Sequence, residues 1–315
     1  MNDAAPTPVL ATEERAEAGA GVAPSVKPDA ETSSVRAAHS IVFGEGDDPR
    51  RWYSTNLVGL SAATIASTEF NAAPVRLFVA ATRETHRGLF ALLKQTESLV
   101  EASEVFAAYM QVAFGLRKPD RDSPPAQARA TRSSYLKVLQ GWGFDSNGPQ
   151  GAVLKGWVES RFGITPTFHG APLIEFPSDA WVKYVEEKLG SRFHNNCIHM
   201  QLDLLFEYCQ FCLEKFAPLG PKPHIRAFRG TYAREAPFVT GSRRERHGVV
   251  RLNNLVSFSL VRDRAEEFGD WLLVTQLPCA KIVFFPGLLD NRVLNGEGEV
   301  LAIGGDFEVD VSYGP

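Results

Sequence analysis

Apolar residues recur at helical spacing through the N-terminal part of the chain. Between residues 84 and 116 they fall three and four positions apart, which favours two helices joined near Ser98–Ser103. Ser178 offers a capping oxygen ahead of another apolar run, so a helix should begin directly after it. The longest helix is expected at Asn195–Phe216, with shorter helical stretches at 135–140 and 151–162.

The pattern changes after the breaker PLGPKP at residues 218–223. Short runs rich in β-branched and aromatic residues now alternate with Gly, Asn and Asp, which predicts strands. The expected strands cover residues 224–232, 248–260, 271–277, 281–287 and 299–313, with a short amphipathic helix at 261–268. Helices followed by strands predict an α+β fold.

The first 38 residues contain no aromatic residue and are rich in Ala, Pro, Glu, Ser and Thr. Such a segment buries too little apolar surface to offset the entropy of ordering, so it is predicted to be disordered. A Pro- and Arg-rich linker is expected at 118–132. The predicted organisation is a tail at 1–38, a mainly helical portion at 39–220 and a strand-rich portion at 221–315.

Composition narrows the class of protein. The 315 residues include 33 Lys and Arg against 37 Asp and Glu, so no basic excess favours nucleic-acid binding. No readable signal peptide opens the chain, and no apolar run approaches the ~18 residues of a membrane span. Four cysteines are too few for a disulfide scaffold. We therefore expect a cytoplasmic protein without a membrane span.

The only CxxC pair, Cys209 and Cys212, lies within the longest predicted helix, on or beside its apolar stripe. Core packing is the favoured interpretation, and metal or redox chemistry is the alternative. Motifs of Rossmann dehydrogenases, P-loop enzymes, zincins and serine hydrolases are absent from the sequence. No metal site is expected.

Polar residues at the ends of predicted strands are the candidates for chemistry. Arg229 ends the first strand, Ser257 and Ser259 lie two apart near the end of the second, and Glu297 and Glu299 stand at the start of the last. Each has an ordinary structural explanation: a salt bridge, turn chemistry or a solvated strand edge. Together they suit cleavage of the nicotinamide–ribose bond of NAD, which needs a diphosphate anchor and a carboxylate facing a cationic ribose.

At these residues the chain resembles the arginine-serine-glutamate class of mono-ADP-ribosyltransferases. The resemblance implies that Glu299 is catalytic and that Glu297 acts on the acceptor arginine. It implies that Arg229, Gly230, Ser257 and Ser259 contribute to binding NAD, with Gly230 offering backbone groups to the nicotinamide amide and Ser257 supporting the glutamate and the ribose. It further implies a strand-rich NAD-binding core of two small sheets.

The middle motif is SFS, where the class more often has STS. Since the residue between two same-face serines points to the other face of a strand, Phe258 is expected in the core.

More narrowly, the chain beyond about residue 40 resembles the dinitrogenase reductase ADP-ribosyltransferase family. Stretches that carry the likeness include YLKVLQGWGFDSNGPQGAVLKGWVESRFGI, NNCIHMQLDLLFEYCQFCLEKF and NNLVSFSLVRDRAEEFGDWLL. The resemblance implies transfer of ADP-ribose from NAD to one arginine of dinitrogenase reductase, the nitrogenase iron protein, which inactivates nitrogenase. It also implies regulation by a PII-type nitrogen-signalling protein.

Two other functions stay open. An NAD glycohydrolase would use water in place of the acceptor arginine and would not need Glu297, and a regulatory binding module would keep the fold without turnover. The basic stretch SRRERHGVVR, with Arg243, Arg244, Arg246 and Arg251, is interpreted as a solvated hairpin loop, with a docking patch for an acidic protein surface as the alternative.

Overall fold

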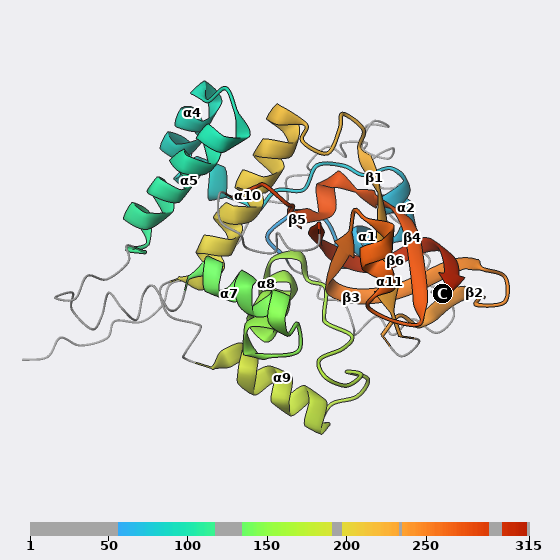
Figure 1. Ribbon diagram of the computed structural model, residues 1–315. Coiled ribbons are helices and arrows are strands. Elements are labelled where there is room, and N and C mark those ends of the chain that lie inside the picture. Colours follow the sequence, from blue (N-terminus) through green and yellow to red (C-terminus); the bar gives the residue numbers. More distant parts are fainter. Residues whose placement is uncertain (1–55, 117–133, 191–196, 233–234, 290–297, 314–315) are drawn as a thin grey trace, which may run out of the picture. The chain divides into compact units, whose positions relative to one another are not determined.

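The computed structural model describes residues 56–116, 134–190, 197–232, 235–289 and 298–313. The predicted disordered tail at 1–38 and the predicted linker at 118–132 lie outside these ranges. Within them the fold combines helices and strands, which confirms the α+β class (Figure 1).

The regular elements of the described chain up to residue 216 are helices. The two helices predicted between residues 84 and 116 are α4 and α5. Ser98 caps the start of α5, because its side chain accepts a hydrogen bond from the backbone N–H of Glu101. Ser178 caps α9 as predicted, accepting a hydrogen bond from the N–H of Trp181. The helices are α1 (Ala62–Ala66), α2 (Thr68–Ala72), α3 (Thr82–Thr85), α4 (Arg87–Gln95), α5 (Leu99–Ala113), α7 (Tyr135–Phe144), α8 (Pro149–Phe162), α9 (Asp179–Leu189) and α10 (Ile198–Phe216).

Strands follow residue 223, as the change of pattern predicts. They are β1 (His224–Thr231), β2 (Phe238–Ser242), β3 (His247–Ser259), β4 (Trp271–Pro278), β5 (Ile282–Phe284) and β6 (Glu299–Tyr313). The short helix α11 (Arg262–Glu266) links β3 to β4, where an amphipathic helix was expected, and a 3-10 turn, η2 (Cys279–Lys281), precedes β5. Strand β2 and the short helices α1, α2 and α3 are not among the elements predicted from the sequence.

The prediction of two small sheets is wrong. The described strands form one antiparallel sheet in the order β2-β3-β1-β4-β6-β5, and an additional pairing of β3 with β6 closes β3, β1, β4 and β6 into a ring. Closure depends on the length of β3 and β6, since each is long enough to pair with more than one neighbour along its course.

A break in register helps the long strands to bend. The β3–β6 pairing shifts between Leu252 and Leu255, opposite the stretch of β6 that holds Gly304 and Gly305. A Cβ on Gly304 would lie 1.6 Å from the carbonyl oxygen of Asn253, and Gly305 has a φ of +118°. Both positions therefore require glycine, one for close approach of the backbones and one for its conformation.

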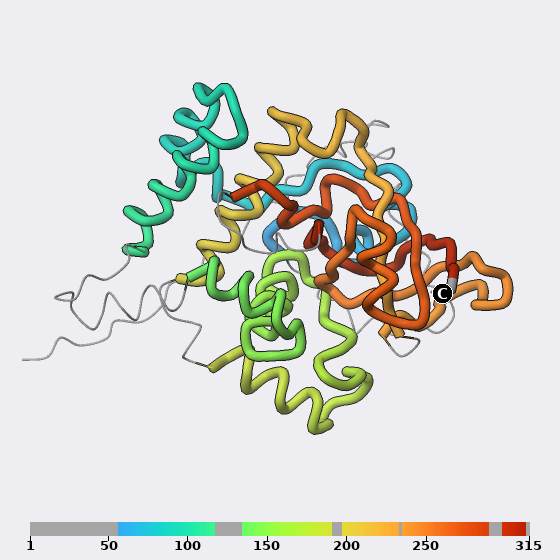
Figure 2. The backbone as a smooth tube through the Cα atoms, viewed as in Figure 1, coloured from blue at the N-terminus to red at the C-terminus, as the bar shows by residue number. Residues whose placement is uncertain are grey.

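Most helices and the strands share the main hydrophobic core, and a smaller cluster of Ala152, Leu173 and Tyr184 is separate from it. Helix α10 packs against β5 and α8 packs against β3, while α1 and α2 near the start of the described chain contact β6 and β4 near its end (Figure 2). No helix in the described ranges is both long and apolar enough to cross a bilayer.

Cys209 and Cys212 pack in this core with none of their surface exposed, which confirms the core interpretation of the CxxC pair. Burial raises the pKa of the Cys212 thiol to about 12, and burial also raises the pKa of Cys209. Thiols held in the protonated form are poor nucleophiles and poor metal ligands.

Candidate active site

Five of the six predicted site residues line one pocket of about 350 Å³. This volume lies within the range of small-molecule sites. The pocket is bounded by the ends of β1 and β3, the start of β6 and the C-terminal end of α7. The five residues are Arg229, Gly230, Ser257, Ser259 and Glu299. The sixth, Glu297, lies outside the described residues.

Strand register brings the serines and the glutamate together. Ser259 pairs with Glu299 across β3 and β6, and Phe258 pairs with Val300. Because side chains alternate along each strand, Ser257, Ser259 and Glu299 share one face. Phe258 lies on the other face and is 2% exposed, which confirms its predicted place in the core.

A chain of hydrogen bonds ends on the carboxylate of Glu299. The hydroxyl of Ser257 donates a hydrogen bond to Oε1 of Glu299. The same hydroxyl oxygen accepts the indole N–H of Trp142 at 2.8 Å. An indole can only donate, so the Ser257 oxygen accepts from Trp142 and its single proton is directed to Glu299. Glu299 is thereby held in one orientation at the pocket.

Arg229 brings a positive charge to the same pocket. Its Nη1 donates to the carbonyl oxygen of Ser257 at 2.9 Å, and its Nη2 lies 3.9 Å from a carboxylate oxygen of Glu235. Burial lowers the pKa of Arg229, and the charges of Glu235 and Glu299 oppose that shift. Among the described residues, its buried Nε has no hydrogen-bond partner. Arg229 therefore keeps donor capacity for an anionic ligand.

Gly230 and Ser259 have local structural roles besides lining the pocket. A Cβ on Gly230 would lie 2.0 Å from the carbonyl oxygen of Ala265 in α11, so only glycine lets α11 pack this closely. The Ser259 hydroxyl donates to the carbonyl of Val261 at 2.8 Å and accepts from its N–H at 3.0 Å. These contacts order the turn from β3 into α11, which is the turn chemistry expected of a serine pair at a strand end.

The helical part of the chain also contributes to the pocket wall. Trp142, Phe144 and Asp145, at the end of α7 and directly after it, line the cavity. None of them is a site residue predicted from the sequence, although the stretch GWGFDSNG that contains them contributed to the family resemblance. Phe144 is 92% exposed, and the half-exposed rings of Tyr232 and Phe268 also line the pocket.

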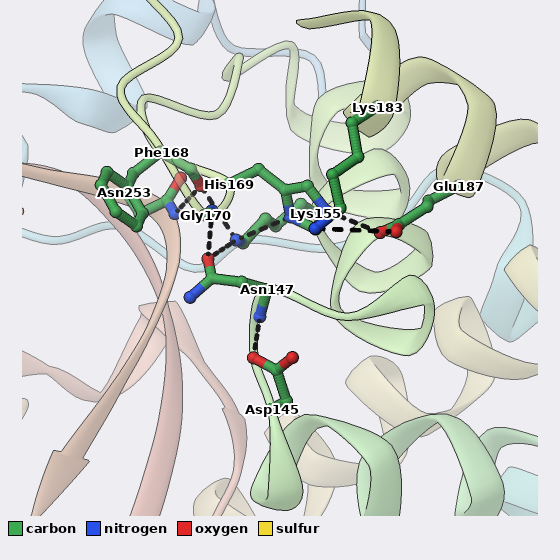
Figure 3. Close-up of polar contacts among 9 residues, drawn as sticks. All are labelled: Asp145, Asn147, Lys155, Phe168, His169, Gly170, Lys183, Glu187 and Asn253. Atoms are coloured by element: carbon green, nitrogen blue, oxygen red, sulfur yellow. Dashed lines mark hydrogen bonds and ion pairs between the residues drawn. The ribbon is translucent and has the colours of Figure 1, made fainter. Parts of the chain in front are cut away.

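A buried lysine fixes the chain segment after α7 (Figure 3). Asp145 accepts the backbone N–H of Asn147 at 2.8 Å, and Oδ1 of Asn147 accepts from Nζ of Lys155 at 3.2 Å. Lys155 also donates to the carbonyl of Phe168 at 2.9 Å. These hydrogen bonds therefore hold this part of the pocket wall against Lys155 of α8.

Lys155 is almost fully buried, and burial lowers its pKa to about 7, with the charge of Asp145 opposing the shift. Its Nζ lies 3.3 Å from Nδ1 of His169, whose Nε2 is 2.8 Å from a carboxylate oxygen of Glu187. Burial and the charge of Lys155 lower the pKa of His169. The group is a polar network within the helical portion, and it reaches the pocket through Asp145.

The basic stretch after β2 forms a hairpin turn, as predicted. Strands β2 and β3 pair on either side of it, with Ser242 opposite His247. Arg251 does not belong to the loop surface: it is 8% exposed and forms a two-point ion pair with Asp306 at 2.7 Å. Its inclusion in a docking patch is therefore wrong, because it is a buried strand residue with an ion-pair partner on β6.

A larger open groove of about 750 Å³ lies over β1, β4 and β6. None of the predicted site residues lines it, and its side chains include Asn71, Arg226, His247 and Gln276. The smaller pocket is the candidate active site because it gathers the arginine, the serines and the glutamate.

An NAD-cleaving ADP-ribosyltransferase is the class of protein that this residue set suggests. Comparison with known proteins then gives the family. The chain matches the family described as dinitrogenase reductase ADP-ribosyltransferase (DRAT) over residues 55–311, and it belongs to that family. The family predicted from the sequence is confirmed.

A curated relative from Rhodospirillum rubrum is 48% identical over 270 residues, which cover 85% of this chain and 98% of the relative. It is named NAD(+)--dinitrogen-reductase ADP-D-ribosyltransferase. No solved structure matches the chain.

Proposed function

We propose that this protein transfers ADP-ribose from NAD to an arginine of dinitrogenase reductase. Family membership and the relative named for this activity support the reaction and its protein substrate. The observation that carries the proposal is the pocket that Glu299, held by Ser257, lines together with the partly buried Arg229.

The reaction breaks the bond between the nicotinamide nitrogen and C1′ of the ribose, and the bonding electrons leave with nicotinamide. Positive charge then develops on the ribose, and the carboxylate of Glu299 is the group we assign to stabilise it. Arg229, with its free Nε and its fixed fork of donors, is assigned to the diphosphate. Gly230, Ser257 and Ser259 are assigned to the surface that binds NAD.

The acceptor half of the reaction forms a bond between a guanidine nitrogen and C1′ and releases one proton. Glu297 is assigned to polarise the guanidinium and to receive that proton. Under this proposal the enzyme acts in the cytoplasm, where both NAD and dinitrogenase reductase are available, and a PII-type nitrogen-signalling protein regulates it.

The test mixes the purified protein, NAD labelled in its adenylate part and dinitrogenase reductase, and follows protein-bound label and free ADP-ribose separately. Label on a single arginine of dinitrogenase reductase supports the proposal. Free ADP-ribose alone, with no label on that protein, refutes transfer and favours the NAD glycohydrolase. Absence of both products favours the binding module. An unrelated arginine-rich protein is the control for acceptor specificity.

A further inference from the structure

Trp142 lies in the helical part of the chain but is hydrogen-bonded to the catalytic strands. It belongs to the last turn of α7, is 5% exposed, and donates its indole N–H to the Ser257 hydroxyl in β3 at 2.8 Å. Its ring also faces the ammonium of Lys155, 5.9 Å from the ring centroid. A buried indole N–H needs an acceptor, and here the acceptor is the side chain that holds Glu299.

We propose that Trp142 is a positioning residue for the transfer reaction, acting on Glu299 through Ser257. This inference rests on the proposed function and on the assignment of Glu299. The indole fixes the rotamer of the Ser257 hydroxyl, so that its proton is directed to the carboxylate in every molecule. Donation from the indole also polarises the hydroxyl and strengthens the hydrogen bond it makes to Glu299.

Two further contacts immobilise this relay. The guanidinium of Arg229 holds the backbone carbonyl of Ser257 at 2.9 Å, so the serine is fixed at its main chain as well as its side chain. Helix α8 packs against both α7 and β3, which fixes the distance between Trp142 and Ser257. Rigid support of this kind is what a carboxylate needs in order to face a transient positive charge without reorganisation.

The alternative is that Trp142 only fills the core and satisfies its N–H with the nearest oxygen. The two explanations differ in what removal of the N–H changes. A core residue affects stability and leaves the rate of the folded enzyme alone. A positioning residue lowers kcat while KM for NAD stays nearly constant, because the ground-state contacts to NAD are unchanged.

The test compares Trp142→Phe with wild type in the labelled-NAD assay. We expect kcat for transfer to fall about tenfold, with KM for NAD changed less than about twofold. Trp157→Phe is the matched control, since Trp157 is fully buried, its indole N–H donates to Asp203 at 2.8 Å, and neither residue lines the pocket. The control should lose stability and keep kcat.

A double-mutant cycle with Ser257→Ala separates positioning from packing. In the Ser257→Ala background, Trp142→Phe should lower kcat by less than about twofold, because the group through which the indole acts is gone. An equal loss in both backgrounds refutes the inference. If Trp142→Phe fails to fold, a benzothienylalanine at position 142, which keeps the shape of the indole and lacks only its N–H, replaces it in the cycle.

Wild-type enzyme measured in parallel separates the two proposals. Wild type that transfers ADP-ribose, together with a Trp142→Phe variant of unchanged kcat, overturns the role of Trp142 alone. Wild type that gives no label on dinitrogenase reductase overturns the proposed function, and the present inference with it.

Discussion

Exchange of Glu299 for glutamine removes a single charge and leaves the shape of the site intact. The amide keeps an oxygen at the position of Oε1, so the hydrogen bond from Ser257 can persist. Any loss of rate in Glu299→Gln therefore reports the missing negative charge. Misplacement of the side chain is a minor contribution, because the donor that orients it is still present.

The expected loss follows from the surroundings of the carboxylate. Glu299 is partly buried at a pocket, where an effective dielectric constant near 20 gives about 4 kcal/mol for unit charges about 4 Å apart. The ribose carries only part of a charge in the transition state, so we expect about 3 kcal/mol. At about 1.4 kcal/mol per factor of ten, kcat for transfer should fall at least ~100-fold.

Initial rates of label transfer to dinitrogenase reductase at saturating NAD measure this effect. Glu308→Gln is the matched control, because Glu308 is an exposed carboxylate on the same strand, β6, and should leave the rate unchanged. Thermal unfolding of both variants checks that they are folded. A Glu299→Gln enzyme that is folded and within about threefold of the wild-type rate would refute the assignment of Glu299.

Three further variants test other parts of the site. Arg229→Ala should raise KM for NAD at least about tenfold in steady-state assays, because the guanidinium assigned to the diphosphate is lost; an unchanged KM contradicts that assignment. Glu297→Gln should reduce transfer to arginine more than NAD hydrolysis, measured as the ratio of protein-bound label to nicotinamide released, and equal losses would argue against an acceptor role. Lys155 has a pKa of about 7 in the folded protein, against about 10.4 when unfolded, so the unfolded state binds more protons between these values and stability rises with pH. We therefore expect that, from pH 7 to 9 in urea titrations, the free energy of unfolding of wild type rises relative to that of Lys155→Met by about 1 kcal/mol per pH unit. A difference that stays constant with pH would show that burial does not lower the pKa of Lys155.

Local patterns predicted most elements because the decisive interactions lie close in sequence. The cap at Ser178 and the apolar stripe of α10 are signals within one helix, and both helices form where expected. Strand alternation placed Phe258 in the core and the serines on the opposite face. The short helices α1 and α2 were not predicted, because five residues are too few to show a helical period.

Long-range features were not predictable in the same way. Closure of the ring depends on the pairing of β3 with β6, which no single strand shows in its own sequence. Trp142 and Ser257 are separated by 115 residues, and a tryptophan in an apolar helix is normally a packing residue. The burial of Arg251 was missed because its partner, Asp306, lies on another strand.

Because side chains alternate along β6, the number of residues between its glycines and Glu299 decides whether Glu299 faces the pocket. Between the glycines at its bend and Glu299, the strand runs without interruption opposite Leu255–Ser259. Deleting one residue from this stretch would turn Glu299 toward the core and put Gly298 in its place opposite Ser259, whereas deleting two would restore the direction of Glu299. Natural relatives should therefore differ in length here only by even numbers, and an odd insertion would mark a chain that has lost the carboxylate from its pocket.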